Sequence, residues 1–168
     1  GDSWSEVNTG TYGSYLDIDY RSADTVFVSG ISSGGTLVIK SVNGGDTWEI
    51  MEPGDYGPAR DIFFANDQTA FLACNNAILK STNGGSDWYA VICSNLNPIE
   101  FRSIFFPSPD TGYAVGKGLY ENMLKTVDGG ETWEVIPSGI TSGLNFVQFM
   151  NDYTGLVFGE NGVEARTT

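Results

Sequence analysis

An eight-residue signature occurs three times in this chain and constrains its fold more than any other feature. It reads SVNGGDTW at residues 41–48, STNGGSDW at residues 81–88 and TVDGGETW at residues 126–133. Short β-like segments separate the copies, and the spacing of about 40–45 residues is the length of one four-stranded propeller blade. The repeat therefore predicts an all-β protein, a β-propeller built of four-stranded antiparallel blades.

The two ends of the chain resemble the halves of a fourth signature. Residues 1–4 read GDSW, like the end of the signature, and residues 166–168 read RTT, like the approach to it. We therefore expect four blade-equivalents, with the N-terminal strand completing the last blade. The predicted single domain or propeller fragment, 1–168, divides into blade repeats at about 8–48, 49–88, 89–133, and 134–168 plus 1–7.

Charge and composition exclude several classes of function. The net charge is −13 and histidine is absent, which argues against nucleic-acid binding because phosphate contacts need a basic surface. The usual general base and the commonest metal ligand are missing with histidine. No apolar segment approaches the ~18 residues of a membrane span. We expect no cofactor and no metal, and the low proportion of charged residues, 17%, favours an extracytoplasmic location (secreted, cell surface, periplasm or lumen).

The chemistry of the signature indicates a structural turn. A Gly-Gly pair permits positive φ, Asn or Asp accepts backbone N–H bonds within the turn, and Trp buries a large apolar ring. Calcium held by Asp128 is the weaker alternative, because one turn offers too few oxygen ligands. The residues assigned this structural role are Ser41, Asn43, Gly45, Trp48, Ser81, Asn83, Gly85, Trp88, Thr126, Asp128, Gly130, Trp133 and Trp4.

These turns resemble Asp-box (BNR) repeats. The segment FFPSPDTGYAVG at residues 105–116, followed by KTVDGGETW at residues 125–133, is most similar to photosystem II stability/assembly factor-like propellers. The second turn departs from the pattern with Ser86-Asp87, and the first unit lacks the TGYAVG run. The resemblance implies that the first strand of each blade lines a central channel. It also implies that signature turns and first hairpin turns share one face, while variable loops on the opposite face bind ligands.

Two arginines occupy the same position in consecutive units, at the start of the first strand. Arg60 and Arg102 are the equivalents of Leu16 and Asn145. Paired arginines at a channel mouth bind carboxylate or phosphate bidentately, so Arg60, Arg102 and Asn145 are candidate ligand-binding residues. The alternative is that each arginine pairs with an acid between blades, such as Asp61 or Glu100. Three tyrosines would flank the mouth as contact residues or as ordinary loop packing: Tyr15, Tyr56 and Tyr120.

Three functions remain open. The favoured reading is a non-catalytic scaffold that binds a protein or peptide, with an anionic group as one option, through its variable-loop face. The alternative is a glycan-related module, either lectin-like or part of a sialidase or glycosidase, since Asp-box repeats also occur in those enzymes. A two-carboxylate glycosidase needs acids about 5–9.5 Å apart, and the sequence shows no pairing among Asp17, Asp19 and Asp61. A purely structural surface module is the third, and the chain is not expected to be an enzyme by itself.

Assembly and cysteine pairing are also left open by the sequence. Four blades can close alone, two chains can form an eight-blade homodimer, or the chain can be part of a longer propeller, since each blade buries its faces only against neighbours. Cys74 ends a predicted second strand and Cys93 follows Trp88 by one strand. Unpaired thiols are favoured over a disulfide, because a third strand would separate the two.

Overall fold

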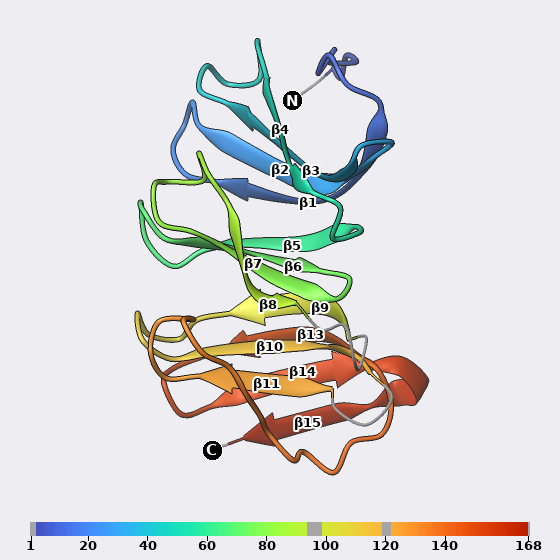
Figure 1. Ribbon diagram of the computed structural model, residues 1–168, viewed down its shortest axis with the longest axis vertical. Coiled ribbons are helices and arrows are strands. Elements are labelled where there is room, and N and C mark those ends of the chain that lie inside the picture. Colours follow the sequence, from blue (N-terminus) through green and yellow to red (C-terminus); the bar gives the residue numbers. More distant parts are fainter. Residues whose placement is uncertain (1–2, 94–98, 119–121, 168) are drawn as a thin grey trace.

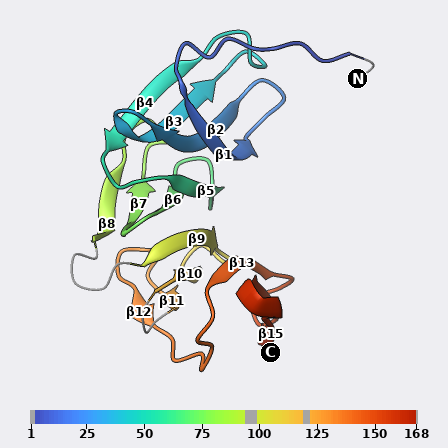
Figure 2. The ribbon, with the colours of Figure 1, turned by 90° about the vertical axis from the view of Figure 1, so that its right-hand side faces the viewer.

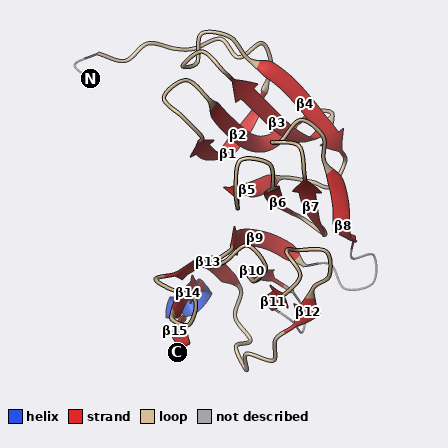
Figure 3. Ribbon diagram, turned by 90° about the vertical axis from the view of Figure 1, so that its left-hand side faces the viewer, coloured by secondary structure: helices blue, strands red, loops and turns tan. Residues whose placement is uncertain are grey.

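The chain forms four antiparallel β-sheets stacked one after another (Figure 1). The computed structural model describes residues 3–93, 99–118 and 122–167. Each sheet takes its strands in chain order, as the repeat predicts for successive blades. Figures 2 and 3 show the sheets following one another along an open stack.

Each of the first three sheets has four strands. The first contains β1 (Gly13–Tyr20), β2 (Val26–Ser32), β3 (Gly35–Ser41) and β4 (Glu49–Gly54). The second contains β5 (Ala59–Phe64), β6 (Ala70–Cys74), β7 (Ala77–Ser81) and β8 (Tyr89–Cys93). The third contains β9 (Glu100–Phe105), β10 (Gly112–Lys117), β11 (Met123–Thr126) and β12 (Glu134–Val135).

The fourth sheet has three strands among the described residues: β13 (Leu144–Phe149), β14 (Gly155–Gly159) and β15 (Glu164–Thr167). A short 3-10 helix, η1 (Glu160–Gly162), joins the last two. The expectation that the N-terminal strand completes this sheet is wrong for the single chain. Residues 3–12 form no strand, and the two ends of the chain lie at opposite ends of the stack (Figure 1), because the sheets do not close into a ring.

The core lies between neighbouring sheets. Strand β6 is buried along its whole length, since sheets cover both of its faces. Aromatic rings join the sheets: Phe27 packs against Phe64 and Phe71 stacks on Phe106, with ring centroids 4.7 and 4.3 Å apart. Trp88 and Trp133 pack against these same two clusters, so the signature tryptophans stabilise the boundary with the preceding sheet.

In the first three sheets, the lysine next to the last residue of the third strand has a packing role. Lys40, Lys80 and Lys125 lie over aromatic rings of the adjacent second strand, with Nζ 5.2–5.8 Å from the ring centroids. The quadrupole of each ring attracts the positive charge of the lysine.

Within the described part of the chain, no helix is long and apolar enough to span a membrane.

Candidate binding face

Backbone hydrogen bonds fix which turns share a face. In the first three sheets a glycine of the signature turn donates its N–H to a carbonyl in the first hairpin turn. The three pairs are Gly44 to Asp24, Gly84 to Gln68 and Gly129 to Asp110, at 2.8–2.9 Å. We call this the turn face; it lies at the left of Figure 1. The opposite ends of the first strands, with the connections between sheets, form the loop face.

Each of the three signature turns has the same pattern of internal hydrogen bonds. In the third turn the Gly130 N–H donates to the Thr126 hydroxyl at 2.9 Å, and that hydroxyl donates to Asp128 at 2.7 Å. Asp128 also accepts from the Thr132 N–H and hydroxyl at 2.9 and 2.6 Å. Hydrogen bonds from Thr132 and Thr126 hold the pKa of Asp128 well below its ordinary value. The carboxylate is therefore occupied within its own turn.

The other two turns repeat this arrangement with asparagine. Asn43 and Asn83 accept hydrogen bonds from the hydroxyls of Ser41 and Ser81, at 2.9 and 3.0 Å. The Trp48 indole donates to the Gly45 carbonyl at 3.0 Å. These contacts support the structural role predicted for the residues of the three complete signatures, whereas Trp4 is 95% exposed.

β-Bulges present one residue of each first strand on the loop face. The register of the first and second strands shifts by one residue in every sheet, and the extra residues are Leu16, Arg60, Arg102 and Asn145. A bulge leaves its extra residue outside the ladder and redirects the side chain. The position that the sequence singled out is therefore a bulge in all four sheets.

Five charged side chains form a row of alternating sign across the second, third and fourth sheets; we call it the charge row. Glu100 accepts from Arg60 at 2.5 Å and from Arg102 at 3.2 Å, so one carboxylate bridges the two arginines. Glu160 accepts from Arg102 at 2.9 Å and from Lys117 at 3.1 Å. The row carries three positive and two negative charges in a chain whose net charge is −13.

The row leaves its two terminal cations accessible. The side chains of Arg60 and Lys117 are 34% and 52% exposed, whereas that of Arg102 is 16% exposed. Burial alone lowers the pKa of Arg102, but the Glu160 and Glu100 carboxylates raise it above its ordinary value. Hydrogen bonds from Arg102, and then from Lys117, lower the pKa of Glu160. These shifts keep both Arg102 and Glu160 charged at neutral pH.

The structure brings together three of the six predicted ligand-binding residues. Arg102 donates to the Asn145 side chain at 2.6 Å, and Arg60 joins the pair through Glu100. Both arginines thus contact an acid between sheets, the alternative left open by the sequence, with Glu100 rather than Asp61 as the partner.

The predicted tyrosines are not part of the charge row. The Tyr15 hydroxyl lies 2.5 Å from that of Thr9, within its own segment. Tyr56 is partly buried against the core between the first two sheets. Tyr120 lies outside the described residues, as does the side chain of Cys93. Cys74 is buried, and burial raises its pKa to about 12.

Sequence reasoning missed Lys117, Glu160 and Asn75, which accepts from Arg60 at 3.3 Å. When the second strands of the repeats are aligned, all three residues occupy the same position. Asn75 directly follows Cys74, Lys117 follows Gly116 and Glu160 follows Gly159. Opposite charges at one aligned position in neighbouring units were the signal that would have found Lys117 and Glu160.

The acids of the first strands also have partners. The Asp17 carboxylate accepts from the Ile62 N–H at 2.9 Å, and that of Asp61 accepts from the Ile104 N–H at 2.8 Å. The two carboxyl groups interact: burial, and then the charge and hydrogen bond of Asp17, raise the pKa of Asp61 to about 7. Asp17 therefore lies close enough to Asp61 to affect its pKa, because stacking of the sheets brings successive first strands together.

Solved structures give the same architecture. YCF48 from Cyanidioschyzon merolae matches 92% of this chain with a TM-score of 0.67 at 18% identity. An ancestral GH74 enzyme matches 99% with a TM-score of 0.74 at 20% identity, and the computationally designed Ika4 protein matches 98% with a TM-score of 0.71 at 10% identity.

Two of these proteins are longer than this chain, and Ika4 has nearly the same length. The chain spans 50% of the YCF48 protein, 24% of the GH74 enzyme and 97% of Ika4. No protein-family model matches the sequence, and no curated protein does. The stacked four-stranded sheets and these structural neighbours identify the fold as that of a β-propeller, similar to the YCF48 and GH74 propellers.

Proposed function

We propose that this chain is a non-catalytic scaffold that binds a protein or peptide bearing an anionic group through its loop face. The charge row carries the proposal. It gathers three of the chain's eight basic residues within one network, on the face where the loops differ from unit to unit. A carboxylate that approaches Arg60 or Lys117 meets an accessible cation held in place by neighbouring acids.

Preorganisation supports this role. The Glu100 and Glu160 carboxylates restrain the long cationic side chains, so binding loses less rotamer entropy than it would with free surface arginines. Arginine also matches carboxylate geometry through two parallel hydrogen bonds. The extracytoplasmic location expected from the composition remains part of this proposal.

The proposal is tested with a peptide display library selected against the whole chain. We expect the selected peptides to be enriched in Asp, Glu or a free carboxyl terminus. Arg60→Gln should weaken their binding about tenfold or more in fluorescence anisotropy. Arg21→Gln is the matched control, because it removes the same charge on the turn face, where Arg21 contacts Asp67 at 3.0 Å.

Two outcomes would reject a binding role for the charge row: no enrichment of acidic peptides, or equal effects of the two substitutions. The glycan-related alternative would draw on the first-strand acids, but Asp17 and Asp61 already hold backbone N–H groups of the next sheet. A glycan array probed with the same variants tests it directly.

A further inference from the structure

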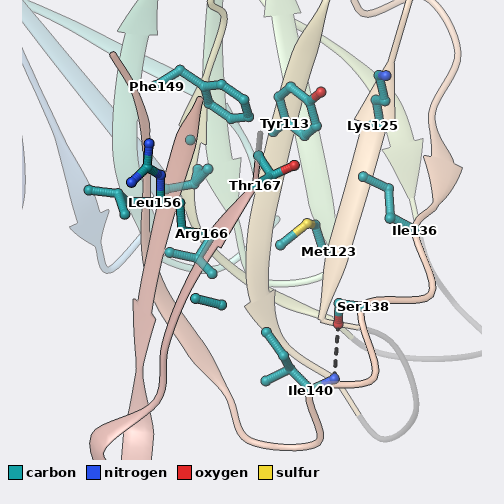
Figure 4. A pocket seen from close by; sticks show the side chains of 14 residues that line it. Tyr113, Met123, Lys125, Ile136, Ser138, Ile140, Phe149, Leu156, Arg166 and Thr167 are labelled. Carbon is teal, nitrogen blue, oxygen red and sulfur yellow. Dashed lines mark hydrogen bonds between the residues drawn. The ribbon is translucent and has the colours of Figure 1, made fainter. Parts of the chain in front are cut away.

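A cavity of about 450 Å³ opens between the third and fourth sheets (Figure 4). Its lining is largely apolar and includes Tyr113, Met123, Ile136, Ile140, Phe149 and Leu156. The Lys125 and Arg166 side chains contribute the charged part of the wall. Leaving apolar surface of this kind in water is unfavourable, so a group that fills the cavity would stabilise the protein.

The two preceding boundaries between sheets show what occupies the equivalent space. Trp133 meets Phe71 and Phe106 edge-on, at centroid separations of 6.4 and 5.8 Å and interplanar angles of 85° and 86°. Trp88 packs against the cluster that contains Phe27 and Phe64. Each boundary is therefore filled by the signature tryptophan of the later sheet.

The cavity has the same aromatic pair but no tryptophan among the residues described. Tyr113 stacks on Phe149 with centroids 4.3 Å apart, as Phe71 stacks on Phe106 at 4.3 Å. Tyr113 pairs with Lys125 across strands β10 and β11, and Phe71 pairs with Lys80 across β6 and β7. The cavity is thus the place of a fourth signature tryptophan, and the outer edge of β15 is the place of the strand that would carry it.

The chain carries a tryptophan of this type at its other end. Trp4 follows Ser3 as Trp133 follows Thr132, its side chain is 95% exposed, and its segment forms no strand. The N-terminal and C-terminal ends lie at opposite ends of the stack (Figure 1), so the cavity is remote from the Trp4 of the same chain.

We propose that residues 3–7 of a second copy of this chain dock along β15 and insert Trp4 into the cavity. The terminal sheets support a reciprocal exchange. Phe146 and Phe158 are exposed on the fourth sheet, and Ile18 and Tyr20 are exposed on the first. Apolar faces like these are buried between the other sheets. Two copies exchanging their N-terminal segments would bring the faces together in a closed ring of eight sheets.

Light scattering across a dilution series tests the proposal, with Trp4→Ala as the variant and Tyr12→Ala as the control. Tyr12 is 98% exposed in the same segment but lies outside the signature. We expect the wild type and Tyr12→Ala to have twice the 18.1 kDa mass of one chain. Trp4→Ala should dissociate at concentrations at least about 100-fold higher, since burial of a tryptophan is lost. Circular dichroism should show the same fold, because Trp4 makes no core contact within one chain.

A synthetic peptide of residues 1–8 gives an independent readout. In excess it should convert the dimer into a peptide-bound single chain, and the same peptide with alanine for tryptophan should not. A wild type that is monomeric at about 100 µM, or a dimer that persists in Trp4→Ala, would overturn the proposal. Open polymers would overturn the closed dimer. None of these outcomes bears on the charge row, so the proposed function stands or falls separately.

Discussion

The backbone N–H of Ile62 donates a 2.9 Å hydrogen bond to the Asp17 carboxylate and so joins the second sheet to the first. The equivalent residues of the next two first strands also accept a hydrogen bond from the following sheet. Asp61 accepts from Ile104 at 2.8 Å, and the Ser103 hydroxyl accepts from Val147 at 3.3 Å. In each of the first three sheets, one residue of the first strand thus connects that sheet to the next.

Asp61 makes stability depend on pH. Its pKa is raised from 3.8 to about 7 in the folded protein, first by burial and then by Asp17. The folded state therefore holds a proton that the unfolded state releases between about pH 4 and 7, and stability falls as pH rises through this window. The wild type should be more stable to urea at pH 5 than at pH 8, on the order of a few kcal/mol.

Asp61→Asn should remove most of this difference, since the neutral amide oxygen still accepts from Ile104. Asp19 remains in both proteins, and its pKa is also raised, mainly by burial. The variant should therefore keep a smaller decrease of stability with rising pH. An unchanged pH dependence in Asp61→Asn would show that Asp61 is ionised in the fold.

The hydroxyls of the signature turns should matter for stability. The buried Ser81 hydroxyl donates to Asn83 at 3.0 Å and accepts from the Gly85 N–H at 2.9 Å. Ser81→Ala leaves that N–H unsatisfied and should cost about 1–3 kcal/mol of unfolding free energy. The neighbouring exposed Thr82 provides the control, and Thr82→Ala should cost less than about 0.5 kcal/mol. Equal costs in urea titrations would argue against the turn network.

Gly116 is required by the close approach of two strands. A Cβ atom there would lie 2.1 Å from the Glu100 carbonyl oxygen, so the backbone beside the charge row must move. Gly116→Ala should lower stability by more than about 2 kcal/mol and also weaken acidic-peptide binding. Cys74 is the equivalent position in the second sheet and already carries a Cβ, so Cys74→Ala should leave binding unchanged. A fully stable Gly116→Ala protein would contradict this reading.

Glu100 restrains the two arginines, and its negative charge lowers the net positive charge of the charge row. Glu100→Gln removes the carboxylate that contacts Arg60 and Arg102, and raises the row from one net positive charge to two. We expect acidic peptides to bind several-fold more tightly at low salt, with the gain reduced at 0.5 M NaCl by screening. Thermal unfolding should occur at a lower temperature, because two partly buried cations lose a partner. Weaker binding would instead show that the restraint that Glu100 places on the arginines outweighs the effect of its negative charge.

Local features could be predicted from the sequence because they depend on residues close together in the chain. The turn networks of Asn43, Asn83 and Asp128 each lie within one signature. The sheets follow from the same repeat, and the shared position of Arg60 and Arg102 proved to be a bulge.

Contacts between sheets could not be predicted in the same way. The bridge from Glu100 to both arginines, and the hydrogen bonds from Ile62 and Ile104 to first-strand acids, depend on how far one sheet is rotated and shifted on the next. The expected closure by the N-terminal strand failed within one chain for the same reason, since the repeat sets the blade but not the curvature of the stack.

Arginine side-chain NMR on the ¹⁵N-labelled chain tests binding at the charge row most directly. The four arginines report on separate places: Arg60 and Arg102 lie in the row, Arg21 lies on the turn face and Arg166 lines the cavity. Titration with a selected acidic peptide should shift the Nε–H signals of Arg60 and Arg102 and leave those of Arg21 and Arg166 in place. Shifts confined to Arg21 or Arg166, or no shift at saturating peptide, would contradict the proposed binding face.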